Sequence, residues 1–215
     1  MLIGARGGLG AALVERLSHM GARVTGLTRA DGLDYHAPAS VDRALEGLSP
    51  GFDAIIVATG ALHVTTDRPE KSLSELTAEE LAAEFMVNAI GPALVLRHAP
   101  RLLRRDGRST FAAISAKVGS IGDNRLGGWY SYRASKAALN QIIRTGAIEI
   151  ARSHRQSVCV ALHPGTVDTR FTANYPAHKK VAPAVSADNL LRVLGGLGTE
   201  DTGQFYNWDG TRLPW

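Results

Sequence analysis

Short apolar runs alternate with longer helical segments along the whole chain, and this alternation limits the fold more than any other feature. Candidate strands lie at Leu2–Ile3, 23–28, 53–59, 110–115, Ser157–His163 and near 203–208, and candidate helices at 9–20, 41–48, 78–105, 131–154 and 187–194. Apolar strands suit a sheet that is covered on both faces. Strands that alternate with helices build parallel sheets with right-handed connections. The sequence therefore predicts an α/β fold, a doubly wound parallel sheet with helices on both faces, in a single domain over residues 1–215.

The composition is that of a folded globular protein. The chain has 215 residues, of which 45% are hydrophobic and 20% charged, and this excludes a disordered chain. The one cysteine, Cys159, excludes an intramolecular disulfide. The sequence shows neither a long apolar run of about eighteen residues nor a charged N-terminal segment followed by a long apolar one. We therefore expect a cytoplasmic protein with no membrane span.

The charge gives little support to a nucleic-acid partner. The sequence pI is about 9.5, but the formal net charge is only +4 and the basic residues are mostly scattered. The densest cluster lies along and just past one predicted helix, where the helix dipole favours cations; it consists of Arg97, Arg101, Arg104, Arg105 and Arg108. The histidines show no metal-ligand spacing. We expect neither a nucleic-acid partner nor a metal.

A glycine-rich loop follows the first predicted strand. Gly4, Gly8 and Gly10 stand between an apolar run and a helical segment that Gly21 ends. Glycines at such a junction let the backbone turn tightly and approach a pyrophosphate, whose charge is favoured at a helix N-terminus. The alternative is an ordinary strand-to-helix turn. The position of the loop, at the first strand–helix junction, favours dinucleotide binding.

Tyr132 and Lys136 form a second pattern with chemical meaning. They stand four residues apart in a run without Gly or Pro, so both side chains should share one face of a helix. A nearby ammonium favours phenolate and lowers the pKa of a phenol from its usual value near ~10. A tyrosine tuned in this way exchanges protons near neutral pH. The alternative is a solvated face of an amphipathic helix.

With these two patterns in this order, the chain resembles the short-chain dehydrogenase/reductase family over nearly its whole length. Two further segments are similar to that family, Val87-Asn88-Ala89-Ile90-Gly91-Pro92 and His163-Pro164-Gly165-Thr166-Val167-Asp168-Thr169. Segments 115–140 and 207–210 are similar to its C-factor-like branch of small carbonyl reductases. The resemblance implies a Rossmann-type fold and an NAD(P)-dependent oxidoreductase that acts on carbonyl or alcohol groups.

The resemblance also implies an active site. Tyr132 would be the general acid/base, Lys136 would tune it and hold the nicotinamide ribose, and Asn88 would orient a water that feeds protons to Lys136. The cofactor would contact Gly4, Arg6, Gly8, Leu9, Gly10, Arg29, Asp34, Ala58, Thr59, Gly60, Lys136, Pro164, Gly165, Val167 and Thr169. Residues 170–180 would act as a lid, with Phe171 and Tyr175 either against an apolar pocket or in ordinary loop packing.

The end of the second strand bears on the choice of cofactor. An NAD site usually places an acidic residue there, which accepts from the ribose hydroxyl. This chain has Arg29 instead, whose fork of donors suits a 2′-phosphate, and Arg6 of the glycine loop could reach the same group. Both residues favour NADP over NAD, although Asp31 follows closely. Asp34 resembles the family's aspartate at the adenine ring.

The chain departs from the family at the catalytic serine. Alignment through Gly119 places Ala116 where relatives carry serine. Its neighbour Ser115 is our candidate for this role, although adjacent strand residues point to opposite faces and Ser115 would need a bulge or the end of the strand. Ser120 is a weaker substitute. If neither hydroxyl reaches, Tyr132 alone would polarise the carbonyl.

Three function classes follow from these residues. The first is an NADP-dependent carbonyl reductase or alcohol dehydrogenase, expected as a homodimer or homotetramer because relatives pair the helices predicted at 78–105 and 131–154. The second is a cofactor-binding regulatory or signalling protein of the C-factor type with little turnover, which the departure at Ala116 supports. The third is an epimerase or dehydratase, and the glycine spacing and chain length argue against it.

Overall fold

A six-stranded parallel sheet forms the centre of the computed structural model, which describes residues 1–175 and 179–215. The remaining three residues belong to the predicted lid and lie outside the described part. The strands are β1 (Leu2–Ile3), β2 (Gly26–Leu27), β3 (Ala54–Val57), β4 (Ser109–Ile114), β5 (Ser157–His163) and β6 (Phe205–Asn207), in the order β2-β1-β3-β4-β5-β6. Every neighbouring pair is parallel. This confirms the predicted α/β class and the Rossmann-type sheet.

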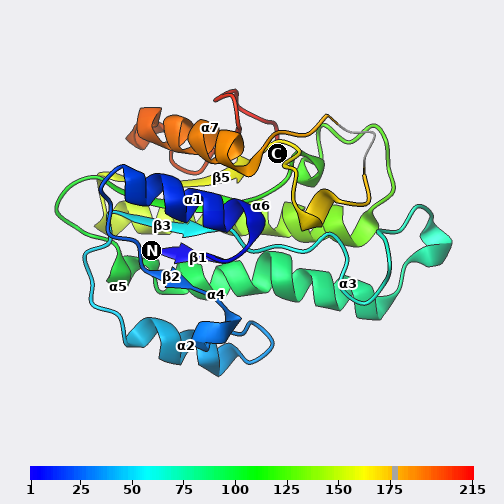
Figure 1. Ribbon diagram of the computed structural model, residues 1–215, viewed down its shortest axis with the longest axis horizontal. Coiled ribbons are helices and arrows are strands. Elements are labelled where there is room, and N and C mark those ends of the chain that lie inside the picture. Colours follow the sequence, from blue (N-terminus) through cyan, green and yellow to red (C-terminus); the bar gives the residue numbers. More distant parts are fainter. Residues whose placement is uncertain (176–178) are drawn as a thin grey trace.

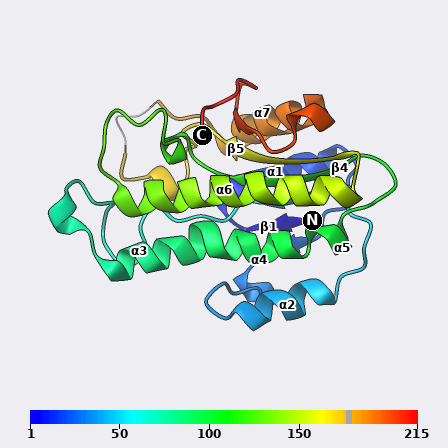
Figure 2. The same cartoon turned by 180° about the vertical axis from the view of Figure 1, so that it is seen from behind.

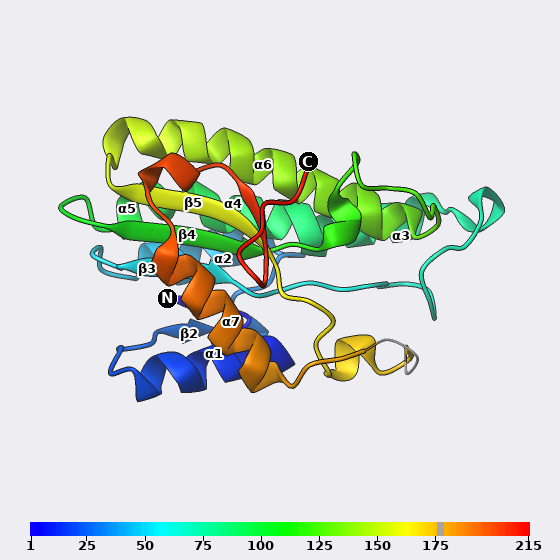
Figure 3. The same ribbon diagram turned by 90° about the horizontal axis from the view of Figure 1, so that it is seen from above.

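Helices cover both faces of the sheet (Figures 1 and 3). Successive strand residues point to opposite faces, so Phe111 and Ala113 of β4 face one layer and Ala112 faces the other. The first layer contains α2 (Pro38–Glu46), α4 (Gly91–Arg97), α5 (Ala99–Leu102) and α6 (Tyr130–Ser153), and the second contains α1 (Gly8–His19) and α7 (Pro183–Gly196). Burial of a side chain such as that of Phe111 contributes about 1.5–3 kcal/mol.

The segment predicted as a helix over 78–105 is divided near Pro92, where a proline is expected to kink or break a helix. It consists of α3 (Ala78–Phe85), a π-helical turn (Met86–Ile90), α4 and α5, and it ends at Leu102. Pro92 has no N–H to offer the carbonyl of Asn88 four residues earlier, which accounts for the wider turn at this point. The second interruption, at His98, precedes Pro100. Figure 2 shows α6 alongside α3 and α4, so the π turn faces the helix that carries Tyr132 and Lys136.

Local capping differs from the sequence pattern at the start of α3. Thr77 accepts from the backbone N–H of Glu80 at 3.2 Å, as a capping box predicts. The Glu80 carboxylate does not return to the cap; it accepts from the backbone N–H groups of Val64 and Thr65, each at 2.6 Å, and from that of Thr66 at 3.1 Å. Three backbone N–H groups of the loop stabilise the Glu80 carboxylate more than the single backbone N–H of Thr77 would in a capping box. Glu80 therefore ties this loop to α3.

Short 3₁₀ turns follow several strands and connect the longer elements. They are Arg29–Asp31, Leu73–Glu75, Lys117–Gly119, Arg170–Thr172 and Thr199–Asp201. β2 is shorter than the predicted run of 23–28, because it lies at the edge of the sheet and pairs with β1 alone through two residues. Among the helices described over 1–175 and 179–215, none combines the length and the apolar character that crossing a membrane requires.

Candidate active site

A cavity of about 450 Å³ opens at the carboxyl ends of the strands. Loops that follow β1, β3, β4 and β5 line it, together with the first turns of α6. Twelve residues predicted from the sequence border this one space: Gly8, Leu9, Ala58, Thr59, Gly60, Ser115, Tyr132, Lys136, Pro164, Gly165, Val167 and Thr169. The fold thus brings together segments more than 150 residues apart in the chain, from Gly8 to Thr169. The crevice outside the carboxyl ends of an open parallel sheet is the usual ligand site of such folds.

The glycine loop shapes one end of the cavity. Gly4 has φ +85°, in the left-handed region that a glycine adopts without strain. A Cβ atom on Gly10 would collide with the carbonyl oxygen of Gly4, so the turn closes only with glycine there. The N-cap of α1 is Gly7, which has no side chain to occupy the amides of the first turn. The positive end of α1 therefore faces the cavity and fits an anion such as a pyrophosphate.

Two arginines stand near the end of β2, outside the cavity lining. Arg6 forms an ion pair with Asp31 at 3.7 Å, and its side chain is 69% exposed. Arg29 is exposed in the 3₁₀ turn that follows Thr28. The Asp31 carboxylate turns back to accept from the Thr28 hydroxyl at 2.6 Å, and this bond and Arg6 lower its pKa. Asp31 thus caps its own turn and pairs with Arg6, whereas Arg29 is exposed to solvent.

The loop beyond this turn carries Asp34. One of its carboxylate oxygens accepts from the backbone N–H of His36 at 3.0 Å, and its own N–H donates to Ser40 at 2.9 Å. These contacts hold the loop against the start of α2. Asp34 is half-buried and does not border the cavity. Thr59 does border it, and its hydroxyl lies 3.0 Å from that of Tyr35.

Tyr132 and Lys136 lie on one face of α6, as their spacing predicts, and both border the cavity. The Lys136 Nζ atom donates to the carbonyl oxygen of Ile114 at 2.9 Å and lies 6.0 Å from the centroid of the Tyr132 ring. Both side chains are buried. Burial lowers the pKa of Lys136 to about 8, so the amine is poised to change charge near neutral pH.

The expected lowering of the Tyr132 pKa is not found. Burial raises the pKa of the phenol above its usual range, and the nearby carboxyl of Glu84 raises it further. The ammonium of Lys136 is too distant to reverse these two effects, because its hydrogen bond goes to Ile114. The hydroxyl of Tyr132 is therefore held in its protonated form, which is the form that donates a proton.

Asn88 lies in the π turn and joins two parts of the site. Its amide forms a two-way pair with the backbone of Ala61, accepting from the N–H at 2.9 Å and donating to the C=O at 2.9 Å. Its Nδ2 atom also lies 3.1 Å from the Ser135 hydroxyl on α6. A Cβ on Gly60 would lie 3.3 Å from Asn88 Oδ1 and 3.4 Å from Lys136 Nζ, so both side chains approach the same small space.

The serine candidates do not replace the missing hydroxyl directly. Ser115 follows the end of β4, and its hydroxyl donates to Oδ1 of Asn140 on α6 at 2.7 Å. The strand alternation continues through Ala116, whose φ of −143° and ψ of 143° are extended, so no bulge redirects Ser115. Ala116 instead packs in one apolar cluster with Leu62 and Tyr132. The one proton of the Ser115 hydroxyl is thus already donated.

Ser120, the weaker substitute, is also engaged elsewhere. Its hydroxyl lies 3.4 Å from the carbonyl oxygen of Trp215 and accepts from the backbone N–H of Asp123 at 3.1 Å. It does not border the cavity. The position beside Tyr132 is therefore occupied by the methyl group of Ala116.

Comparison with known proteins decides the family. Residues 32–207 match the family described as Enoyl-(Acyl carrier protein) reductase. The C-signal protein of Myxococcus xanthus is 34% identical over 147 residues, which cover 67% of this chain and 84% of that protein. The chain belongs to the short-chain dehydrogenase/reductase family. The family resemblance predicted from the sequence is confirmed.

Other members of the short-chain dehydrogenase/reductase family show how far the likeness extends. A 1-hydroxy-2-glutathionyl-2-methyl-3-butene dehydrogenase of Rhodococcus sp. is 29% identical over 194 residues, covering 88% of this chain and 81% of that enzyme. A Burkholderia multivorans protein described as a short-chain dehydrogenase/reductase, solved with bound NADP, superposes with a TM-score of 0.83 at 25% identity, covering 100% of this chain and 98% of that one. The carbonyl reductase Sniffer of D. melanogaster shares the fold, with a TM-score of 0.83 at 22% identity and the same coverage. As a member of this family, the protein described here is an oxidoreductase.

Aromatic side chains form one wall near the phenol of this oxidoreductase. The Tyr132 ring lies 6.1 Å from the Phe171 ring and 6.2 Å from the Trp129 ring, and Trp129 lies 5.4 Å from Tyr175. Phe171 and Tyr175 border the cavity, so the first of the two predicted alternatives for them applies. Trp129 has φ 54°, which is a strained conformation for a residue with a side chain.

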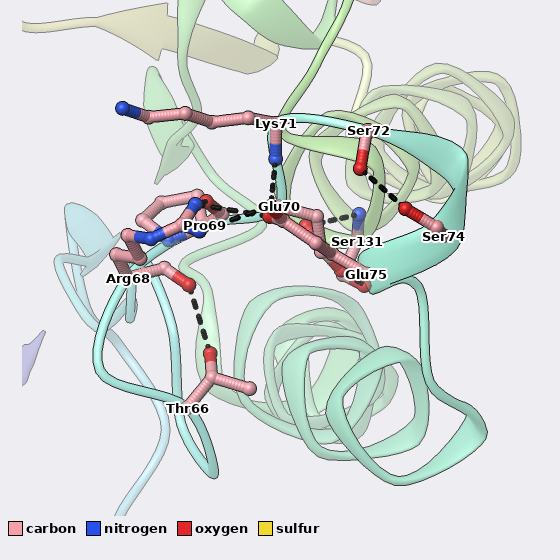
Figure 4. Close-up of polar contacts among 9 residues, drawn as sticks. All are labelled: Thr66, Arg68, Pro69, Glu70, Lys71, Ser72, Ser74, Glu75 and Ser131. Carbon is pink, nitrogen blue, oxygen red and sulfur yellow. Dashed lines mark hydrogen bonds and ion pairs between the residues drawn. The ribbon is translucent and has the colours of Figure 1, made fainter.

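A buried carboxylate holds the strained start of α6. Glu70 accepts from both the hydroxyl and the backbone N–H of Ser131, and its carbonyl oxygen accepts from the N–H of Trp129 at 2.6 Å. Figure 4 shows Glu70 directed at Ser131 while the neighbouring Arg68 binds Glu75 with two hydrogen bonds of 2.9 Å. These contacts fix the loop over 66–75 against the helix end. The carboxylate is favoured there by the dipole of α6.

Sequence reasoning missed the buried carboxyl groups of this site. Glu70, Glu80 and Glu84 are each at most 2% exposed. Glu80, Glu84 and Asn88 recur at intervals of four residues, so they share one helix face, and this spacing could have revealed them. His163 also belongs to the site, although the sequence marks it only as the end of a strand and the start of the Pro-Gly segment. It borders the cavity, and burial lowers its pKa to about 4, so its imidazole is neutral.

Proposed function

We propose that this single-domain protein is an NADP-dependent oxidoreductase that interconverts a carbonyl and an alcohol, with Tyr132 as the general acid/base. One observation carries the proposal. Tyr132 and Lys136 border a single cavity whose other end is the glycine loop at the N-terminus of α1. A candidate proton donor and a loop suited to a dinucleotide thus border one crevice, and this supports hydride transfer to a carbonyl there.

The residues of the crevice fit a nicotinamide dinucleotide. The uncapped first turn of α1 suits the pyrophosphate, and Gly8, Thr59 and Thr169 line the cavity between that turn and α6. When bound, NADPH supplies the hydride that reduces the substrate. The Burkholderia multivorans relative was solved with NADP, which supports the same cofactor here. Asp34 is proposed to contact the adenine part and Arg29 and Arg6 the 2′-phosphate.

Each of the four proposed catalytic residues has a distinct task. Tyr132 donates its hydroxyl proton to the carbonyl oxygen as negative charge develops there, and takes it back in the reverse direction. Lys136 supplies positive charge beside the phenol and holds the ribose. Asn88 orients a water toward Lys136. Its backbone carbonyl oxygen suits this task because Pro92, four residues later, has no N–H to donate to it. Ser115, which borders the cavity, is proposed to polarise the carbonyl, and this requires its hydroxyl to turn from Asn140 toward the substrate.

The pocket favours apolar substrates. Leu62, Ala116, Phe171 and Tyr175 border it, and Tyr132 is packed among apolar neighbours. Ketones or aldehydes with apolar or aromatic substituents are the substrates such a surface selects.

We also propose a homodimer or homotetramer formed through α4 and α6, since Ile90 beside α4 is 40% exposed and Ile148 on α6 is 51% exposed. The cytoplasmic location stays a prediction.

A second candidate function has an observation in its favour. Ala116 stands beside Tyr132 without a hydroxyl, and the Ser115 proton is donated to Asn140. The loss of one donor at the developing oxyanion costs an enzyme about 10²–10³ in kcat. Such a site would bind the dinucleotide and turn over slowly. The alternative is a cofactor-binding regulatory or signalling protein, and the similarity to C-signal supports it.

An assay of NADPH oxidation against a broad panel of carbonyl compounds separates the two functions. The proposed reductase consumes NADPH with at least one apolar ketone or aldehyde, and Tyr132→Phe abolishes that consumption. Tight NADPH binding, measured by calorimetry, without turnover of any panel member would support the regulatory protein instead. Absence of both binding and turnover would contradict both functions.

A further inference from the structure

We propose that Glu84 is a positioning residue that keeps the proton on the Tyr132–Lys136 pair, and so sets the pH at which the active site loses it. This inference rests on the proposed function, because it concerns the same acid/base pair. Glu84 lies in the last turn of α3 and is 1% exposed. It is therefore a carboxyl group inside the protein, not a surface charge.

The contacts of Glu84 lead directly to the catalytic helix. Its Oε2 atom accepts from Nδ2 of Asn88 at 2.6 Å and lies 3.3 Å from the Ser135 hydroxyl. That hydroxyl also lies 2.9 Å from the carbonyl oxygen of Tyr132, and Ser135 precedes Lys136 in the chain. Glu84 thus contacts α6 at the turn that carries both members of the proposed pair.

The partners of Glu84 differ from those of the other buried carboxyls. Glu80 accepts from three backbone N–H groups, which lower its pKa, and Glu70 accepts from the N–H and hydroxyl of Ser131. Glu84 has the amide of Asn88 and the hydroxyl of Ser135 instead. A hydroxyl and one amide stabilise a carboxylate less than a set of backbone N–H groups does.

The charged groups around Glu84 come from three elements. Glu80 lies one turn earlier on α3, Glu70 lies on the loop before it, and Lys136 and Tyr132 face it from α6. Burial and the two acidic neighbours raise the pKa of Glu84 to about 8, while Lys136 acts in the opposite direction. Glu84 is therefore neutral at pH 7 and becomes charged as the pH rises through about 8.

Ionisation of Glu84 has one consequence for the pair. A negative charge at this point raises the pKa of Tyr132 and that of Lys136. Both groups then keep their protons to higher pH, so the site stays competent to donate a proton in alkaline solution. Because the groups interact, the property that changes is the apparent pKa of the pair and not that of either residue alone.

Glu84→Gln tests the proposal, because glutamine keeps the size and the oxygen acceptor but not the charge. The alkaline limb of kcat/KM for carbonyl reduction should move to lower pH by roughly one unit. Glu79→Gln is the matched control: Glu79 is exposed on the same helix, and its removal should leave the limb in place. An unchanged limb in Glu84→Gln would overturn the proposal.

A second readout needs no turnover and separates this inference from the proposed function. NMR titration of the lysine side-chain resonances, compared with that of Lys136→Met, reports the acid ionisation of Lys136 in the folded protein, because its pKa of about 8 lies in a pH range that can be measured. Earlier ionisation in Glu84→Gln than in Glu79→Gln supports the inference even if no carbonyl is reduced, whereas coincident curves overturn it even if the enzyme is active. If Glu84→Gln does not fold, infrared spectra of the wild-type protein decide: a protonated carboxyl band should persist to about pH 8, and its loss by about pH 6, close to ordinary glutamate behaviour, contradicts the proposal.

Discussion

The Nζ atom of Lys136 lies 6.0 Å from the centroid of the Tyr132 ring and gives its hydrogen bond to the backbone of Ile114. The amine is therefore beside the phenol without being bonded to it. In this arrangement burial dominates the electrostatics and keeps the phenol protonated. The phenol therefore keeps its proton, as the proposed role of Tyr132 as a general acid requires.

The two positions at the end of β4 should respond to mutation in opposite ways. Ala116→Ser places a hydroxyl beside Tyr132 and should raise kcat for carbonyl reduction by about 10-fold or more. The upper limit is the gain of about 10²–10³ in kcat that one oxyanion donor contributes. Ser115→Ala removes the partner of Asn140 and should lower the free energy of unfolding by about 1–3 kcal/mol. Its loss of kcat should be smaller than that of Tyr132→Phe. Steady-state kinetics and chemical denaturation measure both. A loss of kcat in Ser115→Ala as large as that in Tyr132→Phe would show that Ser115 is the main donor.

Cofactor preference should depend on the arginine after β2. Arg29→Ala should raise KM for NADPH by about 10- to 100-fold, since a bidentate charge-assisted contact contributes about 1.5–3 kcal/mol, and should leave KM for NADH nearly unchanged. Arg23→Ala is the control, because Arg23 is an exposed arginine before β2, at the opposite end of the strand. Equal changes of KM for both cofactors would contradict a 2′-phosphate contact at Arg29.

The start of α6 should be sensitive to the loss of one hydroxyl. Ser131→Ala leaves the Glu70 carboxylate short of a buried partner and should lower the free energy of unfolding by about 1–3 kcal/mol. Ser74→Ala, which removes an exposed hydrogen bond to Ser72 in the same loop, should change it by less than about 0.5 kcal/mol. Urea denaturation compares them, and equal effects would show that the Glu70 contact does not hold the helix.

Stability should reveal the buried acid through its pH dependence. The folded-state pKa of Glu84, about 8, is above that of an unfolded glutamate near 4.5, so the folded state binds the extra proton between these values. The free energy of unfolding of the wild type therefore falls as pH rises through this window, relative to Glu84→Gln. The difference should grow by about 4 kcal/mol between pH 5 and pH 9. A difference that is independent of pH would mean that Glu84 is already ionised in the folded protein.

The sheet and the face of α6 that carries Tyr132 and Lys136 follow from local patterns in the sequence. Apolar runs placed the strands, and the four-residue spacing of Tyr132 and Lys136 placed both on one helix face. The break at the π turn was foreseeable from Pro92, although its form was not. Such features depend on neighbours in the chain, and they can be predicted without knowledge of tertiary packing.

The electrostatics of the site could not be predicted in the same way. The direction of the Tyr132 pKa shift depends on burial and on Glu84, which α3 brings to α6 from 48 positions earlier in the chain. The Ser115 hydroxyl is directed by Asn140, 25 positions away. These partners meet only when the helices pack on the sheet. A pattern in the sequence gives the candidates, but the fold decides what each of them touches.

The central claim is that Tyr132 protonates a carbonyl that receives hydride in the crevice at the glycine loop. Its most direct test is the transfer of deuterium from NADPH labelled at both C4 positions to the carbonyl carbon of an apolar ketone, followed by mass spectrometry of the alcohol. The wild type should give deuterated alcohol, and Tyr132→Phe should give at least about 100-fold less while it binds NADPH with unchanged affinity. Alcohol formed without the label, or undiminished transfer by Tyr132→Phe, would contradict the account.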